Sequence, residues 1–576
     1  MQTIDINEKL KKIKREAEER DARRRAQKNN IPYLNIITTP INIEAIGLIP
    51  EKEARELKTA AIELKNKELG VVVYNPNILN FKKLMEILRE RGYKIQIFVV
   101  SLSSLEHAYS FYKFISPEKN KITGSVGVAG EANQKITEIS SIKKVESALG
   151  LLGQAPTDVA NFLEIILIGA SQNKASDIHF EAMEDFIKLR FRIDGVLYDV
   201  YGEINKNFYS YLISRIKLLS GLKINIRDEA QDGRFTINFP QKNIEVRVAI
   251  APSEFGEVVV MRILDPEAIS LSLLNLGIRE DDLEIIKNEL KRPNGLILNT
   301  GPTGSGKTTT LYAFLKYKKT PNIKIITIED PIEYHLEGIE QTQVDEEAGY
   351  TFANGLRSLM RQDPDMILVG EIRDKETAEI GIQSALTGHL VLSTVHANSA
   401  AGAIPRLLDL GVKPSSIGPA LNLVIAQRLV RRLCQNCRKK TKATEEIRKK
   451  IEIFLNNLPK RVDKAKYKEI EIFEPLVNGC EKCNNSGYKG RVGIYELLLN
   501  DPEYERFLID QTHTKLSSHK ELEELILSTA SESQIKKFAV EQGATTMRQD
   551  GILKVIQGIT TFEEVEAVTG TISWQV

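Results

Sequence analysis

Three glycines, a lysine and a threonine stand at fixed spacing in the segment GPTGSGKT, residues 301–308. The segment fits the pattern GxxxxGK[ST], with the apolar run Leu296–Leu298 before it and a helix-forming stretch after it. Such glycines let backbone N–H groups curl around phosphate oxygens, while Lys307 reaches the β and γ phosphates and the Thr308 hydroxyl binds Mg²⁺. A chance match is the alternative, which the flanking strand and helix patterns disfavour. The predicted nucleotide-binding residues here are Gly301, Pro302, Thr303, Gly304, Ser305, Gly306, Lys307, Thr308 and Thr309.

Acidic residues follow two further apolar runs downstream. The run IKIITIEDPIEY predicts a strand that ends in Glu329, Asp330 and Glu333, and DPDMILVGEIRD predicts a buried strand that ends at Glu371. Nucleotide hydrolysis needs carboxylates that organise Mg²⁺ and the attacking water, and these sit at the ends of neighbouring strands. We therefore interpret the second run as a Walker B strand with Glu as its acid. Acidic residues in solvated loops are the alternative for both segments.

A third apolar run, TGHLVLSTVHANSA, places His396 at its end. A histidine there could sense the γ phosphate or position a carboxylate. A histidine that is satisfied within its own loop is the alternative, because a single histidine is weak evidence for a site.

All four cysteines fall in two CxxC pairs, CQNC with Cys434 and Cys437, and CEKC with Cys480 and Cys483. Two such pairs can close a tetrahedral zinc site of thiolates that has no open position for catalysis. Free or redox-active thiols are the alternative. We predict a structural zinc site that anchors the charged, helical insert between the pairs, residues 438–479.

These residues need a scaffold, and the hydrophobic patterns predict one. After the segment SLSLLNLGI, residues 270–278, strand and helix patterns alternate to about residue 430, as in a parallel α/β sheet. Before it, Ile244, Val246, Val248 and Ile250 alternate with polar residues, which predicts a mostly antiparallel sheet with one polar face. The expected division is a charged helical tail at 1–30, an N-terminal α/β domain at 31–115, a linker at 116–155, a middle domain at 156–268, and a nucleotide-binding domain at 269–576 with its cysteine subdomain at 430–495.

The tail carries ten basic and six acidic side chains within residues 1–29. A solvated, partly disordered arm and a helix that docks on a partner or a membrane surface are the two interpretations.

Composition narrows the classes of partner. The 576 residues include 79 Lys plus Arg and 78 Asp plus Glu, so the net charge is 79 − 78 = +1. A balanced charge gives no overall field to hold nucleic acid, so we expect no nucleic-acid partner. No apolar run approaches the roughly 18 residues that cross a bilayer, and the N-terminus lacks the apolar stretch of a signal peptide, which predicts a cytoplasmic protein.

The motifs together resemble the secretion ATPases of bacterial type II secretion and type IV pilus assembly. The resemblance covers most of residues 157–570, and the segment 31–115 looks like the family's variable N-terminal domain. The matching segments are GPTGSGKTTT, IEDPIEY, LRSLMRQDPDMILVGEIRDKETA, TGHLVLSTVHAN, AQRLVRRLCQNC and CEKCNNSGYKGRVGIYEL.

This resemblance implies an α/β fold with a RecA-like P-loop NTPase core, preceded by a PAS-like α+β domain. It implies that Glu333 and Glu371 organise Mg²⁺ and activate water, and that His396 is the family's box histidine. The arginines that match are Arg247 and Arg262 of the middle domain, which reach bound nucleotide, and Arg357, Arg361 and Arg491 near the site. Surface salt bridges are the alternative for each arginine, and Ala397 stands where many relatives carry Thr.

The resemblance also implies a function. It predicts a homo-hexameric, Mg²⁺-dependent ATPase that binds ATP and Zn²⁺ and drives an inner-membrane platform protein. Membrane association would be peripheral, through such partners, at the inner face of the cytoplasmic membrane. The resemblance does not distinguish pilus assembly from type II secretion, because both use the same motor. A RecA-like motor that translocates nucleic acid and a docking module without hydrolysis are the rival hypotheses.

Overall fold

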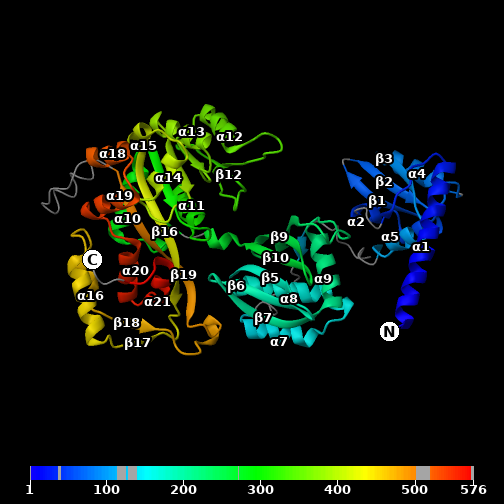
Figure 1. Cartoon of the computed structure of the whole chain (residues 1–576), viewed down its shortest axis with the longest axis horizontal. Helices are drawn as coiled ribbons and strands as arrows, with labels where there is room; N and C mark the ends of the chain where they lie inside the picture. The colour runs from blue at the N-terminus through cyan, green and yellow to red at the C-terminus, as the bar shows by residue number, and fades with distance from the viewer. Residues whose placement is uncertain are drawn as a thin grey trace. The chain divides into compact units, whose positions relative to one another are not determined.

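The structure is a computed structural model, and it describes residues 2–36, 41–65, 67–78, 80–112, 125–127, 139–269, 272–500 and 519–572. The chain divides into two units, Met1–Asp265 and Pro266–Val576 (Figure 1). Each unit is described by itself. Within the ranges above, no helix combines the length and the apolarity that crossing a bilayer requires.

The N-terminal part of the first unit is a small three-stranded α/β fold. Its sheet has the order β1-β2-β3, with β1 and β2 antiparallel and β2 and β3 parallel. A parallel pair needs a crossover connection, which α4 provides. The elements are β1 (Thr59–Lys65), β2 (Glu68–Val73), β3 (Lys94–Val99), α2 (Ile43–Gly47), α3 (Glu51–Glu56), α4 (Phe81–Glu90) and α5 (Leu102–Tyr109).

The charged tail forms one helix, α1 (Gln2–Lys28), whose C-terminal half packs on this fold. Ala22 and Ala26 are buried. Glu19 accepts hydrogen bonds from the Tyr33 hydroxyl at 2.5 Å and from the Ser101 hydroxyl at 2.7 Å. A solvated arm therefore does not describe this half of the helix.

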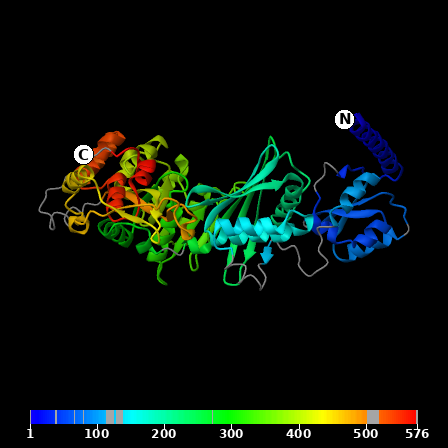
Figure 2. The same ribbon diagram turned by 90° about the horizontal axis from the view of Figure 1, so that it is seen from below.

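The rest of the first unit is a seven-stranded sheet with helices on one face (Figure 2). Its order is β4-β8-β9-β10-β5-β6-β7, and every pair is antiparallel except β4 with β8. Ile244, Val246, Val248 and Ile250 face the helices, as their alternation predicts. The elements are β4 (Ser125–Gly127), β5 (Ala175–Ala182), β6 (Phe186–Ile193), β7 (Val196–Asn205), β8 (Gln231–Asn238), β9 (Asn243–Ser253), β10 (Gly256–Leu264), α7 (Ile142–Leu152), α8 (Val159–Gln172) and α9 (Lys206–Leu219).

The segment expected to be a linker, 116–155, contains structure. Helix α7 buries Val145 and Leu149, one turn apart, in the core beneath the sheet. The expectation is wrong for this helix, because Ile142, Ala148 and Leu152 also pack against this core and give the helix an apolar face. Most of the earlier part of the segment, 116–124 and 128–138, lies outside the described residues.

The second unit is built on a seven-stranded, mainly parallel sheet. Its order is β13-β12-β14-β15-β11-β16-β19, and only the last pair is antiparallel. Strands β11, β12, β14 and β15 are buried along their whole length, with apolar clusters on both faces. The strands are β11 (Gly295–Thr300), β12 (Ile325–Glu329), β13 (Glu340–Gln343), β14 (Met366–Val369), β15 (Leu390–Val395), β16 (Leu421–Leu433) and β19 (Tyr488–Leu499).

Helices cover both faces of this sheet, so the α/β fold with a parallel core is confirmed. Those within the core are α10 (Glu280–Lys291), α11 (Lys307–Lys318), α12 (Phe352–Leu359), α13 (Lys375–Leu386), α14 (Ala403–Asp409) and α15 (Pro414–Ala420). The C-terminal helices are α18 (His519–Leu527), α19 (Glu532–Glu541), α20 (Met547–Ile556) and α21 (Phe562–Thr569).

Between β16 and β19 the chain forms an insert. It consists of α16 (Glu445–Asn457) and a two-stranded sheet of β17 (Lys439–Thr441) and β18 (Ile472–Glu474). Ile451 and Phe454 of α16 share an apolar cluster with Ile552 and Val555 of α20. The insert is therefore packed on the C-terminal helices and is not held by the cysteines alone.

Candidate functional site

The loop Gly301–Gly306 joins central strand β11 to α11, at the carboxyl edge of the sheet. Gly304 and Gly306 have positive φ angles of 79° and 90°, a region that side chains with a Cβ rarely adopt. A Cβ on Gly306 would also lie 2.9 Å from Gln427 Nε2. Glycine is therefore required for the backbone to turn here and to begin the helix at Lys307.

Two polar side chains of the loop fit a phosphate ligand. Lys307 Nζ donates to the backbone oxygens of Gly301 at 2.7 Å and Pro302 at 3.2 Å, so it already lies over the loop. Burial lowers the pKa of Lys307, which the Glu371 charge opposes and the Arg428 charge reinforces. The buried Ser305 hydroxyl has no hydrogen-bond partner among the described residues. A bound anion would supply the acceptor that Ser305 lacks and the negative charge that favours protonated Lys307.

The other residues expected to bind nucleotide lie at the mouth of this loop. Pro302, Thr303, Gly304 and Thr308 are exposed, and Thr309 is half-buried. The exposed Thr308 hydroxyl and the nearby carboxylates are hard oxygen ligands, which suit Mg²⁺.

Glu371 and His396 are brought together by neighbouring parallel strands. Glu371 follows β14, His396 follows β15, and Glu371 Oε2 lies 3.3 Å from His396 Nε2. The other carboxylate oxygen lies 2.5 Å from Arg373 Nη2, and the same arginine reaches Asp330 at 3.7 Å. Since β11 and β15 are also paired, this cluster and the glycine loop share one edge of the sheet.

The three acids Glu329, Asp330 and Glu333, at and after the end of β12, do not share one role. Glu329 is buried at 4% exposure and accepts hydrogen bonds from protein side chains, whereas Asp330 is exposed. Glu333 is half-buried in the loop before β13, and its charge contributes to raising the pKa of Tyr312. The interpretation of three acids in a solvated loop is therefore wrong for Glu329.

The arginines expected near the nucleotide in the second unit have surface partners. Arg357 Nη2 lies 2.5 Å from Glu376 on α13, and Arg361 donates to the Arg357 backbone oxygen at 3.1 Å. Arg491 is an exposed residue of β19, opposite Arg431 of β16. These contacts do not link the three arginines to the glycine loop.

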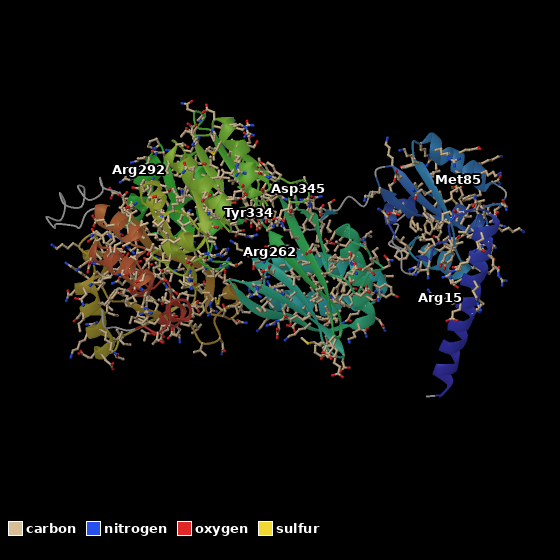
Figure 3. The ribbon with its side chains drawn as sticks, turned by 45° about the horizontal axis from the view of Figure 1, so that its top comes forward. Arg15, Met85, Arg262, Arg292, Tyr334 and Asp345 are labelled. Atoms are coloured by element: carbon tan, nitrogen blue, oxygen red, sulfur yellow. The ribbon has the colours of Figure 1, made fainter. Side chains whose placement is uncertain are left out.

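The remaining two arginines, Arg247 and Arg262, lie in the first unit and face each other across β9 and β10. Arg262 (Figure 3) is 59% exposed, and its Nε donates to the buried Asp177 at 3.1 Å. That contact fixes the base of the guanidinium and leaves its outer nitrogens toward solvent.

The sequence patterns did not identify two residues that lie beside the loop. The buried Gln427 on β16 accepts from Thr310 at 2.8 Å and from Asn299 at 3.2 Å, which fastens α11 and β11 to a third element. Its neighbour Arg428 donates to the Asn398 backbone oxygen at 3.1 Å and lies against Gly301. Both stand in the quoted segment AQRLVRRLCQNC, whose polar residues inside an apolar strand were the available signal.

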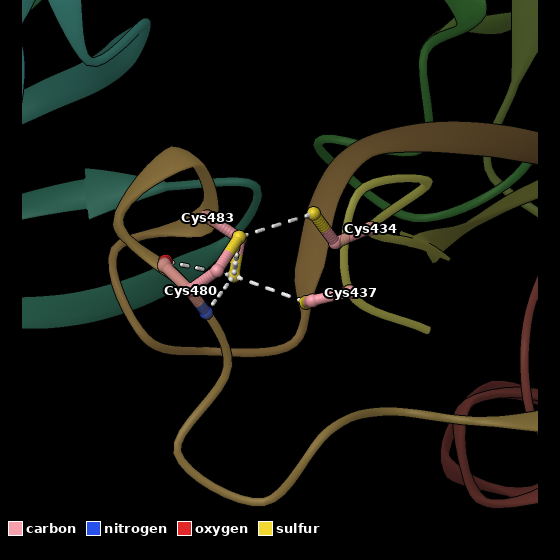
Figure 4. Close-up of side chains that lie close together, drawn as sticks. All are labelled: Cys434, Cys437, Cys480 and Cys483. Atoms are coloured by element: carbon pink, nitrogen blue, oxygen red, sulfur yellow. Dashed lines mark hydrogen bonds between the residues drawn. The ribbon is translucent and has the colours of Figure 1, made fainter. Parts of the chain in front are cut away.

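The four cysteines form a compact cluster (Figure 4). Because β16 and β19 are antiparallel, Leu433 lies opposite Tyr488, which brings the two CxxC pairs together. Each cysteine offers a sulfur atom, and all four lie within 4.8 Å of one another. The separations Cys434–Cys480, Cys437–Cys483 and Cys480–Cys483 are 3.8, 3.9 and 3.8 Å.

These separations fit zinc. A tetrahedron of thiolates about 2.3 Å from zinc has sulfur–sulfur edges of about 3.8 Å. The backbone N–H groups of Cys480 and Gly487 also donate to the Cys483 sulfur, at 3.2 and 3.3 Å.

A parallel α/β sheet whose central strand leads into a phosphate-binding loop, with a carboxylate at a neighbouring strand end, defines a P-loop nucleotide hydrolase. Residues 154–567 match the family described as Type II/IV secretion system protein. The chain belongs to this family.

Curated relatives extend the similarity over almost the whole chain. The type II secretion system protein E of Dickeya dadantii is 43% identical over 92% of this chain and 99% of its own. The type II secretion system ATPase E of Vibrio cholerae is 37% identical over 93% and 99%, and the type IV pilus assembly ATPase PilB of Myxococcus xanthus is 36% identical over 93% and 88%. Among solved structures, the Legionella pneumophila ATPase DotB aligns with 71% of this chain and 95% of its own, at 21% identity and a TM-score of 0.48.

Proposed function

We propose that the chain is a Mg²⁺-dependent ATPase motor that powers type II protein secretion or type IV pilus assembly. The observation that carries the proposal is the contact of Glu371 with His396, at the sheet edge that also bears the glycine loop. The relatives named above support ATP as the nucleotide and a secretion or pilus machine as the place of work.

Each site residue has its own role in the reaction. The backbone N–H groups of the loop and Lys307 bind the β and γ phosphates, with Lys307 exchanging its carbonyl acceptors for phosphate oxygens. Bound through Thr308, Glu333 and Glu371, Mg²⁺ would supply positive charge to the β and γ phosphates. Glu371 orients the attacking water and accepts its proton, and His396 fixes the direction of that carboxylate.

Arg247 and Arg262 would complete the site from the middle domain, residues 156–268. A guanidinium stabilises the charge that develops on the phosphate only when its domain has closed on the nucleotide. Binding of ATP therefore favours a closed arrangement, and release of the products favours an open one. This alternation is the mechanical step of the motor.

The motor acts as part of a larger assembly in this proposal. Six chains form a ring, and the ring works on an inner-membrane platform protein, so membrane association is peripheral and depends on that partner. The cysteine cluster binds one Zn²⁺, which has a structural role because four thiolates leave no open position.

Phosphate release by the purified chain tests this proposal. Turnover should require Mg²⁺, stop when EDTA removes it, and rise on addition of the cytoplasmic domain of a platform protein from either machine. Linear duplex DNA should have no effect. Turnover that rises with DNA and falls with added salt would favour the nucleic-acid motor instead.

A further inference from the structure

The carboxylate of Glu329 is buried among three side-chain donors from three elements. It accepts from Thr327 of its own strand at 2.6 Å and from Gln341 Nε2 of β13 at 3.1 Å. The third donor is the Tyr312 hydroxyl of α11. A buried carboxylate costs free energy unless it is paired in this way, so these donors hold Glu329 in one position.

Tyr312 connects this carboxylate to the phosphate-binding loop. It is fully buried on α11, the helix that begins at Lys307. Its hydroxyl also accepts a hydrogen bond from the backbone of Tyr334, the residue after Glu333 (Figure 3). Burial and the charges of Glu329 and Glu333 raise the pKa of Tyr312, which therefore remains a donor at every working pH.

Gln341 connects the same carboxylate to the other side of the loop between β12 and β13. Its Nε2 also donates to the Tyr334 backbone oxygen at 3.0 Å, and its Oε1 accepts from the Leu336 backbone at 2.6 Å. Two residues further along β13, Gln343 Oε1 accepts from the Ile332 backbone at 3.3 Å. The residues on both sides of Glu333 are thus held by side chains of β13.

We propose that Glu329 is a positioning residue, which together with Tyr312 and Gln341 sets where Glu333 stands relative to the phosphate-binding loop. The inference rests on the proposed function, in which Glu333 organises Mg²⁺. Because Tyr312 lies on the helix that starts at the phosphate-binding lysine, a shift of α11 on nucleotide binding also shifts the acidic loop. Glu329 does not face the nucleotide in this arrangement and is not a ligand.

Tyr312→Phe tests the inference with the loss of one hydroxyl group and no loss of ring volume. The turnover number should fall about tenfold, because the charge-assisted hydrogen bond from Tyr312 to Glu329 is lost and Glu333 is then less well positioned. The Kd of a fluorescent ATP analogue should stay close to that of the wild type, while the melting temperature should fall by a few degrees, because a buried donor to a carboxylate is lost. Tyr350→Phe is the matched control, since the Tyr350 hydroxyl meets Thr342, away from Glu329.

Glu329→Gln should cause a similar loss, since its amide N–H₂ would face donors.

Hydrogen exchange of residues 330–339 gives a readout that does not depend on activity. Exchange in this segment should rise in Tyr312→Phe and not in Tyr350→Phe. Unchanged exchange and turnover in Tyr312→Phe would overturn the inference, as would a loss of turnover that is matched by an equal loss of nucleotide affinity. A wild-type chain that releases no phosphate would overturn the proposed function, while the exchange measurement would still decide the role of Glu329.

Discussion

At the scale of single residues, the Glu371 carboxylate is directed by two partners of different kinds. Arg373 holds one oxygen and His396 the other, and the carboxylate itself is only 15% exposed. Contacts to both oxygens restrict the orientation of the carboxylate. An acid that orients water depends on how it is placed and directed, because a small misplacement is costly for proton transfer.

His396→Ala should therefore lower the turnover number about tenfold, the equivalent of roughly 1.4 kcal/mol, and leave nucleotide affinity unchanged. Phosphate release and analogue binding measure the two quantities separately. His389→Ala is the control, because His389 precedes β15 and contacts the Ser384 backbone oxygen at the other end of the strand. Equal losses in both variants would contradict a specific role for His396.

The sequence predicts the residues of the site better than it predicts how their side chains point. The spacing of glycines and Lys307 predicts the loop, because the pattern is local. Glu329 was grouped with Glu333, although alternation puts Glu329 on the same face as the buried Thr327. Gln427 was missed because its partner Asn299 is 128 residues away in the chain, a distance that no local pattern spans.

At the scale of elements, the insert between β16 and β19 is held by the cysteine cluster and by a buried charge network, in addition to the apolar cluster that α16 shares with α20. Arg461 Nη1 lies 2.7 Å from Asp281 and 2.7 Å from Asp282 of α10. Asp282 is buried, and it also pairs with Arg279. Removal of one partner leaves part of a buried charge without compensation, which is strongly destabilising.

Arg461→Ala should lower the free energy of unfolding of the second unit by about 3 kcal/mol. The midpoint of urea unfolding, followed by circular dichroism, measures it. Lys466→Ala is the matched control, because Lys466 pairs with an exposed Glu280 and water replaces that contact without loss. A midpoint that does not move in Arg461→Ala would contradict the network.

Removal of the metal tests how the cysteine cluster holds the insert. Protein purified without oxygen should contain about one zinc per chain, and Cys480→Ser should lose it with faster hydrogen exchange in α16. Lys482→Ala, which alters an exposed residue between two of the cysteines, should keep the metal. Absence of zinc in the anaerobic wild-type protein would contradict the site.

Elements were predicted best where the hydrophobic pattern is long. Strands β11, β14 and β15 are buried throughout and mainly apolar, as a strand covered on both faces requires, and their order in sequence follows the alternating pattern. Helix α7 and strand β1 were missed. Both are short and carry charged residues at one end or along one face, so their tertiary contacts decide the structure.

At the scale of the whole molecule, the cations expected to reach the nucleotide come from a different unit than the loop that binds it. Arg262 lies in the first unit and Lys307 in the second. A net charge of +1 over 576 residues gives no general attraction to a polyanion. Our central proposal is that the second unit hydrolyses ATP, with Glu371 as the acid that activates the attacking water.

Comparison of Glu371→Gln with the wild type in nucleotide binding and phosphate release tests this claim most directly. The variant keeps the size of the side chain and its contact with His396 but cannot accept a proton. We predict that it binds a fluorescent ATP analogue with wild-type affinity and releases phosphate at least about a hundredfold more slowly. Release at the wild-type rate by this variant would contradict the assignment of the site.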